Sequence, residues 1–449
     1  MIDDLKPYSE YKDSGVAWLG MVPAHWKILR LGAVLKERGE TNERKQVAQV
    51  LSVMKNIGVI PYEKKGKIGN KKSEDISRYK IVRPDDVVVN CMNVIIGSVG
   101  ISRLTGCLSP VYYVLTRRSK TDKPNYLNAV FCVEPFQRSL VRIGNGILSH
   151  RMRIPMELLK CEPFPKPPRD EQVAIVHFIN HAKMRIDKAI RAKRKLIALL
   201  NEQKQVVIHR AMTRGLNSNA KLKPSGVQWI GHIPVNWTVK RLKWVTRLQR
   251  GYDLPQDKRI PGPYPVVSSG GIIGTHCEAK SSGPGIVMGR YGSTNAIFFV
   301  EHDFWPHNTS LFVTDFQGNH KRWSYYLLGT ISKSDHSSKS AVPGVDRKDL
   351  FDIYVPVPSF QEQAILADKI DAEVAGFEKS IKNAEHEITL LREYRTRLIS
   401  DVVTGKLDVR EAAKHLPVKT AELESSMDVD GNETGDEEEF EPALIEGDL

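Results

Sequence analysis

A long helix-forming stretch occurs twice in this chain, and it constrains the fold more than any other feature. Residues 169–213 contain neither proline nor glycine, and their apolar side chains recur at alternating steps of four and three. This spacing predicts one helix of roughly 60 Å with a heptad seam, which has to pack against another helix. The predicted seam consists of Ile175, Ile179, Ala182, Ile186, Ala189, Leu196, Leu200 and Val207, with Lys193 and Gln203 at the two remaining positions.

The partner helix is predicted in the same chain, at residues 359–403. It repeats the first stretch at an offset of 191 residues, and prolines precede both starts. Ser359 and Glu362 have capping-box spacing, while Gly215 and Gly405 lie where the helices should stop. The predicted second seam consists of Ile370, Val374, Phe377, Ile381, Ala384, Ile388, Leu391 and Leu398.

The charges of the two helices favour pairing with each other over self-pairing. Residues 169–210 hold ten Lys/Arg and four Asp/Glu, whereas residues 361–400 hold six and eight. A basic helix and an acidic helix attract each other, and two copies of either one repel. The fixed offset also argues against two unrelated amphipathic helices.

A second repeat lies ahead of each helix. Residues 14–26 recur as residues 225–237, sharing the pattern Ser-Gly-Val-x-Trp-Leu/Ile-Gly-x-Val/Ile-Pro-x-x-Trp at an offset of 211. The chain is therefore a tandem duplication of leader, body and helix. The stretches between leader and helix, residues 27–167 and 238–358, hardly match each other, and we call them the first and second bodies. One duplicated frame thus holds two different surfaces.

Net charge points to a polyanionic partner. The chain of 449 residues carries +13, but residues 417–449 contain twelve acidic residues and one lysine, a net of −11. The first 416 residues therefore carry +24, which suggests nucleic acid, although generic solubility charge is the plainer alternative. The acidic tail has few large apolar residues and is predicted to be disordered.

Length and cysteine usage indicate two or three domains in a reducing compartment. Five scattered cysteines form no Cys-x-x-Cys pair, and there is no signal peptide and no apolar run near 18 residues. We therefore expect a soluble, cytoplasmic protein with no membrane partner.

Catalytic motifs are missing from the sequence. There is no Gly-x-x-x-x-Gly-Lys-Ser/Thr phosphate loop, no Asn/Asp-Pro-Pro-Tyr/Phe methyltransferase signature and no zinc-type Cys/His spacing. A polar run at residues 301–307 is a weak metal candidate, and Asp257 with Glu278 and Lys280 loosely resembles a nuclease core. Both are read more simply as ordinary loops. We therefore expect a non-enzymatic chain with no cofactor and no metal of its own.

The bodies are predicted to be mixed α/β or mostly β, with short β-rich runs separated by Gly, Pro, Asn and Asp. Basic, asparagine-containing and glycine-broken turns are the candidate DNA contacts, because lysine and arginine bind phosphate and asparagine can pair with adenine. Ordinary turn chemistry is the alternative for each. The candidates are Lys64, Lys65, Lys67, Lys71, Lys72, Asn90 and Asn93 in the first body, and Ser268, Ser269, Arg290, Tyr291, Ser293, His307 and Asn308 in the second.

These residues together resemble the specificity subunits of type I restriction–modification systems, over residues 8 to about 408. The likeness rests on the leader, on Pro-x-Pro…Glu-Gln entering each long helix, and on the ending Thr404-Gly405-Lys406-Leu407. The first helix departs from that ending with Thr213-Arg214-Gly215, and the acidic tail is not part of the family pattern.

The resemblance implies an α+β chain with two tandem mixed α/β target-recognition domains, separated by two long antiparallel coiled-coil helices. The domains would be residues 1–168 and 216–358, the spacer helices 169–215 and 359–407, and the tail 408–449. Each recognition domain would read half of a bipartite site in double-stranded DNA. Two modification (methyltransferase) and two restriction (translocase–nuclease) subunits would assemble on the chain, and S-adenosylmethionine, ATP and Mg²⁺ would bind those partners.

Two other function classes compete with this one. A nuclease or methyltransferase with built-in specificity would need a catalytic motif, which the sequence lacks. A purely structural coiled-coil adaptor would not need the +24 charge, nor two bodies that differ where the frame agrees.

Overall fold

A computed structural model describes residues 5–55, 57–66, 71–146, 152–217, 219–290, 296–331 and 345–417. The acidic tail beyond Pro417, with its predicted disorder, lies outside these residues. The chain divides into two compact units. The first unit comprises Met1–Lys188 with Leu391–Leu449, and the second comprises Ala189–Leu390. Within the described residues, no helix is long and apolar enough to cross a membrane.

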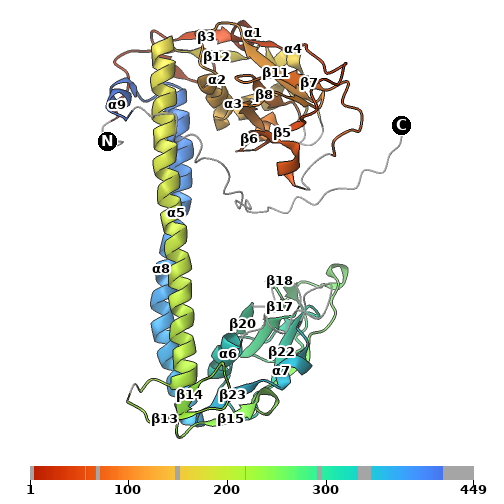
Figure 1. The fold of residues 1–449 in the computed structure, drawn as a ribbon, viewed down its shortest axis with the longest axis vertical. Helices are drawn as coiled ribbons and strands as arrows, with labels where there is room; N and C mark the ends of the chain where they lie inside the picture. The colour runs from red at the N-terminus through yellow and green to blue at the C-terminus, as the bar shows by residue number, and fades with distance from the viewer. Residues whose placement is uncertain are drawn as a thin grey trace. The chain divides into compact units, whose positions relative to one another are not determined.

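The two predicted long helices are α5 (Arg169–Arg214) and α8 (Phe360–Val403), shown in Figure 1. Both end at a glycine with positive φ, Gly215 at +70° and Gly405 at +80°, as the sequence predicted. At the start of α8, Ser359 Oγ accepts the Glu362 N–H over 3.3 Å, which is one half of the predicted capping box. The Glu362 side chain does not return the bond, because it is used elsewhere.

Each unit contains the start of one long helix packed on the end of the other, so the packing within each unit is antiparallel. In the first unit, Ile175 and Ala182 of α5 share a core with Leu398 and Val402 of α8. In the second unit, the end of α5 shares a core with the start of α8, through Ile208, Ala211, Ile370 and Val374.

Part of the predicted seam of α5 is wrong. Leu196 is 42 % exposed and Gln203 is exposed as well, whereas Ile190, Ile197 and Lys204 turn inward. A strict heptad drifts against the 3.6-residue turn of a straight helix, and here the seam takes one extra step of four after Ile186. All the predicted seam positions of α8 are buried or half-buried.

Opposite charges lie along the helix pair in both units. Arg395 Nη1 lies 2.6 Å from Asp187 Oδ1 in the first unit. In the second unit, Lys193 Nζ lies 2.5 Å from Glu387 Oε2, so the predicted polar seam position carries an ion pair. The predicted complementarity therefore has specific partners.

Two bodies with unrelated sequences share one sheet plan. The first body has a four-stranded antiparallel sheet in the order β4-β11-β8-β9, and the second has β16-β22-β19-β20. In both sheets, the strand that comes first in the sequence pairs with the strand that comes last, β4 with β11 and β16 with β22. The strands β8 and β19 occupy the same place in the two sheets. The sheet strands are β4 (Leu35–Glu37), β8 (Val87–Asn90), β9 (Val99–Ile101), β11 (Tyr112–Arg117), β16 (Arg247–Arg250), β19 (Gly285–Gly289), β20 (Ile297–Val300) and β22 (Ser310–Asp315).

Short strand pairs frame each sheet. In the first unit they are β1 (Tyr11–Asp13) with β2 (Met21–Pro23), β3 (Lys27–Arg30) with β12 (Pro163–Lys166), β5 (Leu51–Met54) with β6 (Gly58–Pro61), and β7 (Lys80–Val82) with β10 (Gly106–Leu108). In the second unit they are β13 (Leu222–Pro224) with β14 (His232–Pro234), β15 (Thr238–Arg241) with β23 (Tyr354–Val357), and the three-stranded set β18 (Gly271–His276), β17 (Tyr264–Ser268) and β21 (Trp305–Pro306).

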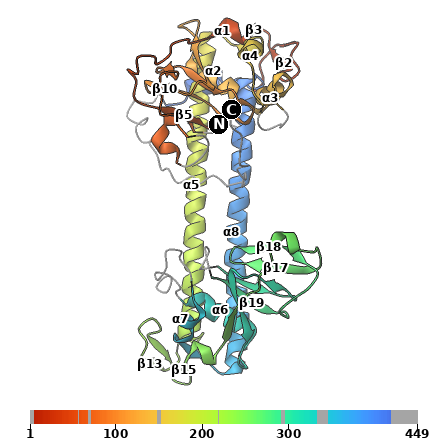
Figure 2. The same ribbon diagram turned by 90° about the vertical axis from the view of Figure 1, so that its right-hand side faces the viewer.

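Short helices complete both units. In the second, α6 packs on β19 and β20. Figure 2 shows α6 beside β19. The α-helices are α1 (Leu31–Val34), α2 (Pro124–Phe131), α3 (Glu134–Ser139), α4 (Met156–Leu159), α6 (Lys321–Thr330), α7 (Arg347–Phe351) and α9 (Arg410–Lys414). The 3₁₀ turns are η1 (Tyr62–Lys65), η2 (Val94–Ile96), η3 (Leu140–Ile143), η4 (Leu242–Trp244) and η5 (Gln256–Lys258).

Candidate nucleic-acid interface

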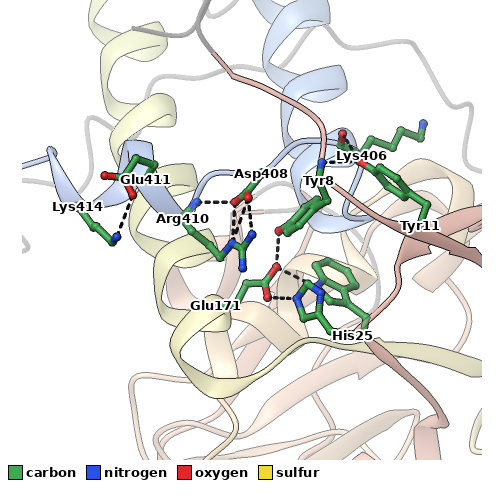
Figure 3. Close-up of polar contacts among 10 residues, drawn as sticks. Tyr8, Tyr11, His25, Glu171, Lys406, Asp408, Arg410, Glu411 and Lys414 are labelled. Atoms are coloured by element: carbon green, nitrogen blue, oxygen red, sulfur yellow. Dashed lines mark hydrogen bonds and ion pairs between the residues drawn. The ribbon is translucent and has the colours of Figure 1, made fainter.

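A buried carboxylate joins the first leader to α5. Glu171 is 4 % exposed and accepts hydrogen bonds from Trp26 Nε1 at 2.8 Å and from the Tyr8 hydroxyl. His25 Nε2 lies 2.7 Å from its other oxygen (Figure 3). Burial, followed by the Glu171 carboxylate, raises the pKa of Tyr8 well above its usual range. The hydrogen-bond donors of the protein satisfy this carboxylate. It therefore holds the leader to α5 and is not available to a ligand.

The second copy repeats this joint with fewer donors. Glu362 Oε1 accepts from Trp237 Nε1 at 2.9 Å, and its Oε2 accepts from Asn236 Nδ2 at 3.1 Å. The glycine that ends the opposite long helix lies against the same tryptophan. A Cβ on Gly215 would lie 3.3 Å from the Trp237 ring, and one on Gly405 would lie 3.0 Å from the Trp26 ring. Both tryptophans are fully buried.

The glutamine after each glutamate ties the body to its helix. Gln172 Nε2 donates to Pro167 O at 3.0 Å, and Gln172 Oε1 accepts the Lys123 N–H ahead of α2. Gln363 repeats both bonds, to Pro358 O at 3.1 Å and from the His320 N–H ahead of α6. The duplicated Glu-Gln pair is therefore the structural joint of each unit.

The two described ends of the chain meet in the first unit. Asp408 N donates to Lys6 O at 2.9 Å, and Tyr11 Oη donates to Lys406 O at 3.0 Å. Arg410 pairs with Asp408 and lies over the Tyr8 ring, 5.1 Å from its centroid (Figure 3). The sequence did not predict this closure.

Two of the candidate lysines of the first body, Lys65 and Lys72, lie over the ring of Tyr62. Lys64 and Lys65 end η1, and the Lys65 and Lys72 ammonium groups lie 4.8 and 6.0 Å from the centroid of the Tyr62 ring. Tyr62 Oη also accepts the Lys72 N–H at 2.9 Å, which ties the loop down. Lys71 is exposed, and Lys67 lies outside the described residues. This cationic cluster is suited to phosphate contact.

The candidate asparagines of the first body lie on a different turn. Asn90 ends β8, is only 8 % exposed, and accepts the Met92 N–H at its Oδ1. Asn93 precedes η2, and its carbonyl accepts the Ile96 and Ser98 N–H groups. Asn90 therefore shapes the turn in this structure, and its side chain would have to move to contact a base.

In the second body the candidate residues converge. Arg290 N donates to Thr309 O, and Ser269 N lies 3.4 Å from Thr309 Oγ1. His307 N donates to Val267 O, next to the buried Ser268. Three separate turns thus meet beside Asn308. Tyr291 and Ser293 lie outside the described residues.

The surroundings of His307 favour its neutral imidazole. Burial, followed by the positive charge of Arg259, lowers its pKa below the ordinary value. Its Nδ1 lies 3.1 Å from Thr309 Oγ1. His307 can therefore donate or accept one hydrogen bond at the surface without adding charge.

The sequence reading missed the loop that completes this cluster. Arg250 ends β16, Tyr252 and Asp253 follow it, and all three are exposed. Arg250 and Asp253 are hydrogen-bonded to Asn308. The run Arg-Gly-Tyr-Asp combines a cation, an aromatic ring and a glycine, which is the signal that could have drawn attention to it.

The described residues offer no support for the metal site or the nuclease core considered in the sequence. In the part of the chain that the structure describes, no group of three or more His, Cys, Asp or Glu side chains is placed to hold a metal ion. Glu278 and Lys280 pair with each other at 3.6 Å on the surface. Asp257 lies on η5, and no hydrogen bond between it and that pair is found among the described residues.

Comparison with known proteins agrees with the resemblance drawn from the sequence. Residues 234–388 match the family model described as the type I restriction modification DNA specificity domain. The type I restriction enzyme MjaVIII specificity subunit of Methanocaldococcus jannaschii is 21 % identical over 430 residues, which cover 87 % of this chain and 94 % of that protein.

A solved structure shares the fold. A chain from a structure described as the basis of complex assembly and conformational transition of the type I R-M system matches with a TM-score of 0.64 at 14 % identity. The match covers 86 % of this chain and 99 % of that one. The mixed α+β architecture with its long helices is therefore a known fold, and the likeness to type I specificity subunits is confirmed.

Proposed function

We propose that this chain is the DNA sequence-specificity subunit of a type I restriction–modification complex. The observation that supports the proposal is that the same frame of leader and long helix occurs twice, each time around a different body. The hydrogen bonds from tryptophan to glutamate and from glutamine to a proline carbonyl occur in both copies. The surfaces of the two bodies, in contrast, differ. A duplicated frame with divergent surfaces suits a protein that reads two different half-sites.

Each body then acts as a target-recognition domain for one half of a bipartite site in double-stranded DNA. The lysine cluster around Tyr62 supplies phosphate contacts in the first body, and the turns around Asn308 supply base contacts in the second. Phosphate contacts position the duplex, and contacts with base edges select the sequence.

The long helices serve as spacer and as a docking site for partners. Their length sets the distance between the two half-sites, because a continuous helix has a fixed rise per residue. Two modification subunits and two restriction subunits bind the chain, and S-adenosylmethionine, ATP and Mg²⁺ belong to those subunits. This chain contributes recognition and no chemistry.

Methylome sequencing of the host with and without the gene tests this proposal. We expect adenine methylation at one bipartite motif to disappear when the gene is deleted. Purified alone, the chain should neither methylate nor cut DNA, whereas with the modification subunit and S-adenosylmethionine it should methylate that motif. Methylation by the isolated chain would rule out the non-catalytic role.

A further inference from the structure

Two loops of the second body cross at a point where only glycine fits. A Cβ on Gly251 would lie 2.1 Å from His307 O, a separation that real Cβ atoms do not show. The crossing is fastened by a backbone hydrogen bond from Tyr252 N to Pro306 O at 2.8 Å. Because β16 and β22 pair immediately beyond these loops, the crossing is held in register. Residues 250–253 and 306–309 therefore form one rigid platform.

Asp253 sets the orientation of the Asn308 amide on this platform. Asn308 Nδ2 donates a hydrogen bond to Asp253 Oδ1. An ionised carboxylate only accepts hydrogen bonds, so the NH₂ group of Asn308, and not its carbonyl, has to face Asp253. Asn308 is half-buried and Asp253 is exposed, so the pair lies at the surface of the body.

Among the described residues, the Asn308 amide makes no other side-chain hydrogen bond, which leaves one N–H and its side-chain carbonyl oxygen for a further partner. A neighbouring donor and acceptor on one planar group complement the N7 acceptor and N6 amino donor of adenine in the major groove. Arg250 Nε donates to the backbone carbonyl of Asn308 over 3.4 Å, so a guanidinium lies beside this residue. This cation offsets the Asp253 charge near DNA phosphates.

We infer that Asn308 reads an adenine in the half-site bound by the second body, with Asp253 as its positioning residue. The inference rests on the proposed function and names the base that this surface selects. The first body has no such amide at the matching position. Asn308 lies two residues before β22, and the corresponding position before β11 is Pro110, which has no side-chain donor or acceptor. The two half-sites are therefore read by different chemistry.

The test replaces Asn308 in the full chain, assembled with its modification subunit. With Asn308→Ala we expect one adenine of one half-site to become degenerate in methylome sequencing. Discrimination at that position should fall about 10- to 100-fold, because a bidentate amide–adenine pair is lost. The other half-site and the spacer should be unchanged.

Asp253→Ala is the second variant, and because Asp253 is exposed it threatens folding less. It should relax the same adenine position more weakly, because the amide remains but can rotate. Asp257→Ala is the matched control, since it removes the same charge from η5 four residues further on. It should leave the recognition sequence intact.

An unaltered recognition sequence in both Asn308→Ala and Asp253→Ala would overturn the assignment. Degeneracy at a guanine, cytosine or thymine, or an equal loss of methylation at every sequence, would also overturn it. A wild-type complex that methylates no bipartite site would instead refute the proposed function itself, so the two failures are distinguishable.

Discussion

The Trp26 indole nitrogen donates a hydrogen bond to the Glu171 carboxylate over 2.8 Å, across 145 residues of sequence. The pair Trp237–Glu362 repeats it at 2.9 Å, across 125 residues. The difference in separation reflects the longer first body, and the bond is the same. Both units contain this joint, but the loss of its carboxylate should destabilise them to different degrees.

Removing the carboxylate should weaken the first unit more than the second. Glu171→Ala leaves the buried Trp26 N–H and the buried Tyr8 hydroxyl unpaired, and should cost about 3 kcal/mol. Glu362→Ala leaves one buried donor, Trp237, because Asn236 is exposed; it should cost about 1–2 kcal/mol. Hydrogen exchange at β3 and at β15 measures the two effects. Equal losses would contradict this account.

Alkaline pH should weaken the first unit through Tyr8. Burial and then the Glu171 carboxylate raise the pKa of Tyr8, so the folded state keeps its proton while the unfolded chain ionises near pH 10. The contribution of Tyr8 is therefore complete below about pH 10 and is lost as the pH rises further. Tyr8→Phe should be less stable than wild type at pH 8, and the gap should narrow by about 1 kcal/mol at pH 11. Denaturant unfolding at both pH values checks this, and a constant gap would refute it.

Exchanging one body should change one half-site. Residues 31–162 lie between β3 and β12, so replacing them with the body of a relative retains the strand pair that closes the frame. We expect methylome sequencing to show one new half-site, with the other half-site and the spacer preserved. Simultaneous change in both half-sites would mean that the bodies do not read independently.

Lengthening the helices should lengthen the spacer. Lys193 and Glu387 face each other, so four residues inserted after Lys193 and four before Glu387 keep the neighbouring partners matched. Four residues add about 6 Å of helix, close to the rise of two base pairs at about 3.4 Å each. Four residues nearly preserve the helical turn, so the apolar seam should survive with a local stutter.

The variant should methylate the same half-sites with a spacer about two base pairs longer. Two-residue insertions at the same points rotate the seam out of contact and should abolish assembly. Retained activity with an unaltered spacer would show that the helices do not set the distance.

Local pattern was sufficient for much of the fold. The two long helices and their glycine ends follow from periodicity, capping residues and turn residues, because these signals act within a few positions of the chain. Periodicity was less reliable over distance. The seam prediction failed at Leu196 because a small drift per turn accumulates along a helix, and only the packed partner shows which side faces inward.

The sequence by itself determined that one frame is used twice, that its two bodies differ, and that the chain resembles a type I specificity subunit. Only the tertiary structure decided that the bodies share one strand order, and that Glu171 and Glu362 bond to tryptophans, which keeps Glu362 from completing its predicted helix cap. It alone brought Asp253 to Asn308. The physical reason is that strand register and loop crossing join residues far apart in sequence, and no local propensity encodes which distant partner each side chain meets.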